Sequence, residues 1–188
     1  MKALLLTLLT LLALPVQAAD YKVGDRLTAQ NAKPGSYKEI TWDDLMPRDW
    51  DPMQALQGLD LNKLQDSDPR AQEALDRLKA SWNAAPANPA MAGKPIRIPG
   101  FMVPLEWGKQ EVKEFLLVPY FGACIHVPPP PSNQVIHVLP AKSVKSKTGM
   151  DAVWVSGVLE ISYKKSELGD ATYRMTNARV EPYKETRR

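Results

Sequence analysis

The chain has 188 residues, 24 basic against 21 acidic side chains and a formal net charge of +3, with a single cysteine and two histidines. This nearly even balance argues against nucleic-acid binding, since the basic residues are scattered except around residues 142–147 and at the C-terminus. A single cysteine excludes an internal disulfide, so it is a buried thiol, a ligand, a reactive group or half of an intermolecular bridge.

Residues 1–18 have the pattern of a cleavable secretory signal. Lys2 gives a positive start, an apolar run from Ala3 to Leu14 follows, and small residues end the segment at Ala18. The run is shorter than the roughly 20 residues of a membrane span, and no second apolar stretch of that length follows. No cysteine stands directly after Ala18 to carry a lipid anchor. We therefore expect a periplasmic protein without a membrane anchor.

Residues 19–94 are predicted to form an N-terminal arm and a helical lead-in. The polar segment 19–40 is expected to be extended, and Thr41 with Asp44 is typical of a short helical turn. Asp68 can cap, and Pro69 can open, a helix over residues 68–83. Apolar side chains recur there at helical spacing and form one stripe, which we expect in the core: Ala71, Ala74, Leu75, Leu78 and Trp82. Residues 84–94 are predicted to be a linker.

Residues 95–188 are predicted to form a β-rich body, within a single domain overall. The period of the apolar residues changes there from helical to strand-like, and turn residues separate the segments. The fold class we expect is mainly β (α+β), a small five-stranded OB-like antiparallel barrel preceded by a short helical region. The alternative is a flat sheet covered by the 68–83 helix. The five expected strands are Ile96–Leu105, Phe115–Val127, Val135–Leu139, Val153–Tyr163 and Tyr173–Val180.

The segment FGACIHVPPPP, residues 121–131, holds the one cysteine and one of the two histidines. In an extended segment Cys124 and His126 lie two residues apart and share a face. A thiolate and an imidazole together suit zinc or copper better than calcium or magnesium. The pair therefore predicts part of a metal site.

The other two expected ligands come from neighbouring strands. Four stiff prolines, residues 128–131, can turn the chain back so that His137 approaches as a third ligand. Glu106, at the end of the preceding strand, is the best carboxylate for a fourth position. The predicted metal residues are thus Cys124, His126, His137 and Glu106.

Each of these residues also has a simpler interpretation. Unpaired cysteine is among the residues most often buried, and one Cys-x-His pair is a weak motif. His137 suits a hydrogen-bonded core imidazole, and the prolines suit a docking surface or a spacer. An enzyme is the less favoured class, because Cys124 does not precede a helix and no Asp or Asn is seen that would orient His126.

Two blocks of sequence resemble a known family. These are PGFMVPLE, residues 99–106, and EFLLVPYFGACIHVPPPPSNQ, residues 114–134. They resemble a proteobacterial family of secreted proteins catalogued as a domain of unknown function. The resemblance covers roughly residues 90–180. It implies a periplasmic protein encoded beside ABC transporters with a large periplasmic permease portion, in gene clusters that in some bacteria answer to zinc shortage.

Three functions follow as hypotheses. The first is a periplasmic metal-binding or accessory protein in zinc or copper trafficking, with an ABC transporter permease or another periplasmic metal-binding protein as partner. The second is a metal-independent adaptor that docks a transporter through the polyproline block. The third, a thiol enzyme, is expected to have a lowered pKa at Cys124.

Overall fold

The structure, a computed structural model, describes residues 21–27, 37–51, 53–58, 68–108, 111–146 and 148–184. The predicted signal segment, residues 1–18, lies outside the described residues. None of the helices in the described ranges is long and apolar enough to cross a bilayer. The elements in chain order are β1 (Lys38–Glu39), η1 (Trp42–Leu45), η2 (Gln54–Leu56), α1 (Pro69–Asn83), η4 (Pro89–Met91), β2 (Pro95–Gly108), β3 (Glu111–Val118), η5 (Ser132–Gln134), β4 (Ile136–Pro140), β5 (Val144–Lys145), β6 (Ala152–Val158), β7 (Glu160–Lys164) and β8 (Ala171–Pro182).

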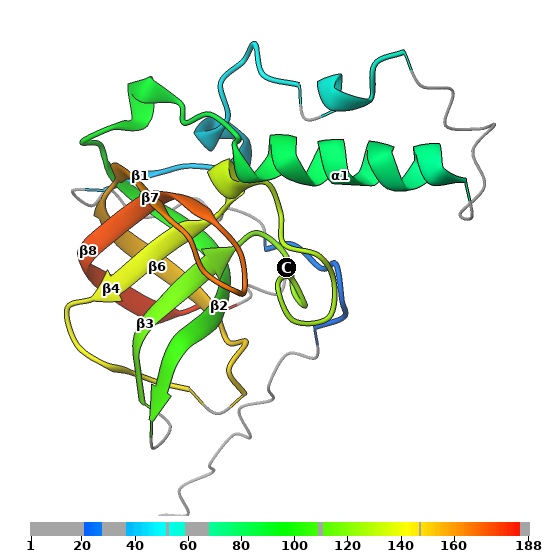
Figure 1. Cartoon of the computed structure of the whole chain (residues 1–188). Coiled ribbons are helices and arrows are strands. Elements are labelled where there is room, and N and C mark those ends of the chain that lie inside the picture. The colour runs from blue at the N-terminus through cyan, green and yellow to red at the C-terminus, as the bar shows by residue number, and fades with distance from the viewer. Residues whose placement is uncertain are drawn as a thin grey trace, which may run out of the picture.

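Five strands close into a barrel, so the OB-like prediction is confirmed (Figure 1). β2 pairs with β3, β3 with β4, β4 with β8, β8 with β6, and β6 returns to β2. Four of these pairs are antiparallel, whereas β4 and β8 are parallel. The parallel pair arises because the chain passes through β6 and β7 before β8 enters beside β4. The long strand β2 closes the barrel, since its first half pairs with β6 and its second half with β3.

Two predicted strands are shorter than expected. The Phe115–Val127 strand ends at Val118, because Pro119 and two left-handed residues, Gly122 (φ 87°) and Cys124 (φ 67°), break the extended conformation. The Val153–Tyr163 strand is split at Leu159 into β6 and β7. Leu159 bonds instead to the linker, donating to the carbonyl of Lys94 and accepting from the N–H of Gly93.

The strands bury side chains on both of their faces. The barrel interior is filled by residues that alternate along the strands, among them Ile96, Ile98, Phe115, Val153 and Val155. The intervening positions of β2 and β3 form a second, outer cluster, whose buried members include Phe101, Val103, Leu116 and Val118. Arm residues Tyr21 and Leu27 pack against this outer cluster. The outer face of β2 and β3 is therefore covered by the chain itself.

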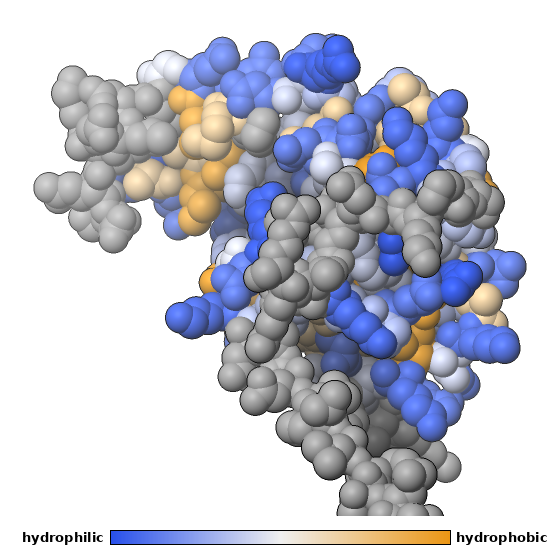
Figure 2. Space-filling view, turned by 180° about the vertical axis from the view of Figure 1, so that it is seen from behind, coloured by the Kyte–Doolittle hydropathy of each residue, from blue (hydrophilic) through white to orange (hydrophobic). Residues whose placement is uncertain are grey.

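The helix α1 begins as predicted but does not cover a sheet. The Asp68 side chain accepts the N–H of Arg70, and Pro69 occupies the first turn. The main packing partner of α1 is η2, and Figure 1 shows the helix projecting beyond the barrel. Only Ala74 is fully buried on the helix, while Leu75 is 44% exposed. The alternative of a flat sheet covered by this helix was therefore wrong. Figure 2 shows apolar surface at the α1 end of the molecule, and Met53, just before η2, is also exposed.

Candidate functional site

Residues 121–127, which we call the Cys124 loop, form a tight turn rather than a strand. The carbonyl of Gly122 accepts the N–H groups of Ile125, His126 and Val127, the shortest being 2.8 Å from His126. Cys124 donates its own N–H to the carbonyl of Val127, over 3.1 Å. The prediction that Cys124 and His126 share one face of an extended strand was therefore wrong.

The N-terminal arm holds this loop against the barrel. Gly24 donates to the carbonyl of Phe121 and Phe121 donates to the carbonyl of Asp25, both over 2.9 Å. The ring of Phe121 lies 5.5 Å from that of Phe101, which lies 5.1 Å from that of Tyr21. Figure 1 shows the arm, drawn in blue, running beside the loop. The loop is thus fixed by internal backbone bonds and by a second segment of chain.

Cys124 lies in a tight, apolar environment. Its side chain is half-buried and packs against the outer cluster of the barrel. A Cβ atom placed on Gly169 would lie 3.4 Å from the Cys124 Sγ and 3.0 Å from Pro129, so this corner holds no spare room. Burial raises the pKa of the Cys124 thiol to about 12. The thiol is therefore neutral at pH 7. A thiol enzyme is expected to have a lowered pKa at its cysteine, whereas the pKa of Cys124 is raised.

The tip of the loop is exposed. Ile125 is 50% exposed, and His126 and Pro128 also face solvent. Tyr120 donates its hydroxyl hydrogen to the carbonyl of Pro128 over 3.2 Å, which fixes the point where the chain leaves the loop. The tip therefore presents an apolar side chain in a set position.

The proline segment, residues 128–131, runs from the surface into the protein. Pro128 is exposed, whereas Pro130 is buried. The three polar residues that follow form the buried turn η5. There Asn133 donates to the carbonyl of Pro86 over 3.0 Å, and Gln134 donates to the carbonyl of Trp42 over 2.8 Å. The turn η5, which follows the proline segment, thus ties the helical lead-in to the barrel.

His137 follows on β4 and has its own acidic partner. Its Nε2 lies 2.6 Å from Oε1 of Glu114 on β3, and the same oxygen accepts from Nζ of Lys164 at 2.6 Å. The Lys164 ammonium holds the pKa of Glu114 below its usual value, against the effect of burial. Burial lowers the pKa of His137, although the bond to Glu114 opposes this. An ionised Glu114 can only accept, so neutral His137 donates its Nε2 hydrogen.

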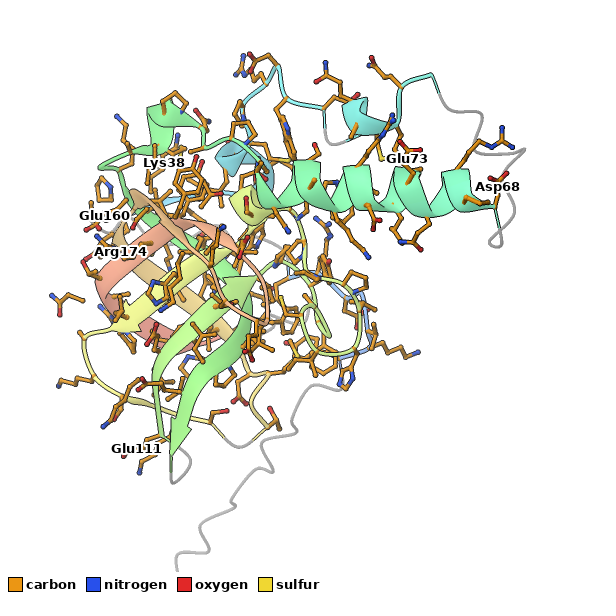
Figure 3. The ribbon with its side chains drawn as sticks, in the orientation of Figure 1. Lys38, Asp68, Glu73, Glu111, Glu160 and Arg174 are labelled. Carbon is orange, nitrogen blue, oxygen red and sulfur yellow. The ribbon has the colours of Figure 1, made fainter. Side chains whose placement is uncertain are left out.

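The ionic contacts continue onto the next strands. Arg174 on β8 stands opposite His137 in the parallel β4–β8 pair, and its Nη2 lies 2.7 Å from Oε2 of Glu160 on β7. Figure 3 shows Glu160 and Arg174 close together on the outside of the barrel. Neutral His137 therefore lies in a row with charged side chains, Glu114, Lys164, Arg174 and Glu160, along the barrel wall.

The structure does not bring the four predicted metal residues together. Cys124 and His126 share a loop, His137 is bonded to Glu114, and Glu106 is an exposed residue opposite Glu114 in the β2–β3 pair. Within the described ranges, which include all four, no three His, Cys, Asp or Glu side chains form a group able to hold a metal ion. A neutral thiol is also a poor ligand, because metals bind the thiolate. These residues do not fit one metal site in this conformation, and metal binding by them stays a prediction.

The buried position of His137 has a consequence for stability that depends on pH. Because the pKa of His137 is lowered in the folded protein, the unfolded chain takes up the proton first as the pH falls through 6.5. We therefore expect the free energy of unfolding to fall between about pH 7.5 and about pH 5.5, and His137→Gln to show a smaller fall. Urea denaturation at both pH values measures this.

Exposed His126 supplies the matched control for that measurement. His126→Gln makes the same substitution at an exposed position, so the pH dependence of the two variants can be compared directly. If the free energy of unfolding of His137→Gln depends on pH as steeply as that of the wild type, His137 is not the source of the dependence. The lowered pKa of Glu114 predicts a further, separate loss of stability as the pH falls below 4.5.

A comparison with known families gives a match that includes the barrel and the Cys124 loop. A family model described as "Protein of unknown function (DUF3299)" matches residues 42–182. The chain belongs to the DUF3299 family. It is similar to the crystal structure of a DUF3299 family protein from Pseudomonas aeruginosa PAO1, with 36% identity and a TM-score of 0.62, over 81% of this chain and 99% of that chain. No curated protein matches the chain.

The DUF3299 match confirms the expected membership of a family of unknown function. It includes the Cys124 loop, the proline segment and β4. Glu114, Lys164 and the polar residues of η5 were not predicted from the sequence. The signal for Glu114 was its position on β3, two residues from Leu116, which pairs with His137 in the β3–β4 register. No comparable local signal pointed to Lys164, which lies far along the chain.

Proposed function

We propose that this DUF3299 protein is a non-catalytic periplasmic accessory protein that docks a partner through the exposed tip of the Cys124 loop. The observation that carries the proposal is Ile125, a large apolar side chain that is 50% exposed at the end of a rigidly bonded loop. A surface that is already ordered loses little entropy on binding, which favours its use in recognition.

The contacts of the loop support docking over chemistry. The thiol of Cys124 is neutral and packed between apolar groups, and its left-handed backbone serves the turn. Pro130 is buried, so the contact surface is the tip at Ile125 and His126, together with the exposed Pro128 that follows the loop. This differs from docking through the whole polyproline block.

The partner we propose is the periplasmic portion of an ABC transporter permease. The family resemblance of residues 99–106 and 114–134 suggests it, through the transporter genes found beside members of that family. Zinc trafficking is the process that the same resemblance suggests. Metal enters the proposal only through the partner, because the four candidate ligands lie apart.

Binding of the purified protein to the purified periplasmic domain of an ABC transporter permease from the same organism tests the proposal. We expect Ile125→Asp to weaken binding at least roughly tenfold, because a charge would replace the apolar anchor. Val158→Asp is the matched control, since Val158 is 47% exposed but lies at the end of β6. Biolayer interferometry with the wild type and both variants gives the comparison.

Equal affinities for Ile125→Asp and the wild type would refute docking through this tip. A chelator arm separates the two classes of function. Binding that survives EDTA fits a metal-independent adaptor, and loss of binding in EDTA shows a metal-dependent complex in place of the one proposed.

A further inference from the structure

We propose that a second site, distinct from the Cys124 loop, binds a small amphipathic anion with a short hydrocarbon body and a carboxylate-like head. The site is a hollow of about 320 Å³ between β1, η1, η4 and the start of β2. Lys38 and Lys94 both line it, and we call it the Lys38–Lys94 pocket. Its lining residues share none with the Cys124 loop or the His137 row.

The floor of the pocket is apolar. Ile40 and Ile96 are 4% and 1% exposed and belong to the barrel core, and Met91 packs against that core. Pro95 and Ala90 add to the lining. The volume lies at the small end of the usual range of ligand pockets, roughly 300–1,000 Å³. Such a floor suits a short hydrocarbon chain, because its apolar side chains cannot form hydrogen bonds with a wholly polar ligand.

The rim carries two available positive charges. Lys38 on β1 and Lys94 after η4 are both exposed, and within the described part of the chain neither has an ion-pair partner. Figure 3 shows Lys38 near the η4 turn, at the end of the barrel away from Glu111. Two cations from segments far apart in the sequence thus border one apolar hollow.

The nearby acidic groups are already engaged. Asp44 lines the pocket, but its Oδ2 accepts both the N–H and the hydroxyl hydrogen of Thr41, each over 2.8 Å. Glu39 lies 3.5 Å from the guanidinium of Arg97. Asp44 keeps its negative charge, so the lining carries the two positive charges of Lys38 and Lys94 against this one, and the balance still favours an anionic head group.

The walls of the pocket are fixed relative to one another. Asn88 donates through Nδ2 to the carbonyl of Asp44 over 2.8 Å and accepts through Oδ1 from Ala90 over 3.1 Å, which joins η1 to η4. The N–H of Asn88 donates to the buried Tyr173 hydroxyl over 2.6 Å, which joins both to the barrel. A preformed pocket costs little entropy to fill.

Octanoate is a suitable probe, because it combines an eight-carbon body with a carboxylate. We expect it to bind the protein with a Kd on the order of 1 mM and to shift the amide NMR signals of Ile40, Met91 and Ile96. Acetate lacks the hydrocarbon body and octylammonium carries the opposite charge, so both should bind at least roughly tenfold more weakly.

Two variants test the charge and the cavity separately. Lys38→Glu/Lys94→Glu should weaken octanoate binding at least roughly tenfold, and Ala90→Trp should abolish it by filling the hollow. Lys113→Glu/Lys165→Glu, two exposed lysines on β3 and after β7, is the matched control and should bind as the wild type does. The amide spectrum of each variant reports whether it is folded.

Three results would overturn the proposal. They are octanoate binding that is unchanged in Lys38→Glu/Lys94→Glu, octylammonium binding as tight as octanoate binding, and signal shifts that lie away from the pocket. None of these measurements involves the transporter domain, so they test this site independently of the proposed docking function.

Discussion

Gly100→Ala is expected to lower the free energy of unfolding by about 2–3 kcal/mol, because the added methyl group has no room. A Cβ atom on Gly100 would lie 2.8 Å from the carbonyl oxygen of Val118 and 2.9 Å from both the Leu117 side chain and the Trp42 ring. The Val118 oxygen is backbone and cannot turn aside. The Trp42 ring is also held, since its Nε1 donates to the carbonyl of Pro99 over 2.8 Å.

Gly157 on β6 is the matched control for Gly100. It is also buried in a barrel strand, but a Cβ atom there would meet its nearest neighbour, the Met175 sulfur, at 3.4 Å. We expect Gly157→Ala to stay within about 0.5 kcal/mol of the wild type. Urea denaturation followed by tryptophan fluorescence measures both. If both variants lose the same free energy of unfolding, the contacts of Trp42 and Val118 at Gly100 do not exclude a methyl group there.

Alkylation of Cys124 by iodoacetamide at neutral pH is expected to be at least about 30-fold slower in the folded protein than in the chain unfolded by guanidinium. The rise in pKa from 9.0 to about 12 lowers the thiolate population roughly a thousandfold. A thiolate of higher pKa is more nucleophilic, so the alkylation rate falls by less than the thiolate population does. Burial of the sulfur against Pro129 and Gly169 slows the reaction further.

Gly122→Ala gives a second variant for the alkylation experiment. Gly122 has a φ of 87°, and a Cβ atom there would lie 3.1 Å from the Val23 side chain, so alanine strains the turn. We expect faster alkylation in this variant, because the loop that covers Cys124 loosens. Fast alkylation of the folded wild type would contradict the neutral thiol and would favour a thiol enzyme instead.

The sequence predicted the helix and the barrel because their signals are local. Asp68 and Pro69 mark the start of α1 by themselves, through a cap and a missing N–H. Val153 and Val155 alternate with Trp154 and Ser156 along the sequence, and the structure places the first pair in the barrel core. Five such segments after a helical lead-in were enough to predict an OB-like closure, although not the parallel β4–β8 pair.

The candidate site could be predicted only in part. The apolar composition of residues 115–127 favoured one long strand, and nothing in the sequence showed that Gly122 and Cys124 would adopt positive φ angles. That conformation depends on the arm residues 21–27, which bond to the loop from about a hundred positions away. Once the loop turns, Cys124 faces Pro129 and Gly169, and the expected shared face with His126 is lost.

The sequence by itself determined the fold class. It also indicated the kind of family to expect, through the two blocks at residues 99–106 and 114–134 that resemble a known family. Both rest on local patterns. The tertiary structure decided which side chains meet. His137 bonds to Glu114 and Lys164, and Lys38 joins Lys94 around one hollow, because strand pairing and loop packing bring together residues that are distant in the chain. Ligand sets and pKa values depend on those long-range neighbours, and no local pattern contains them.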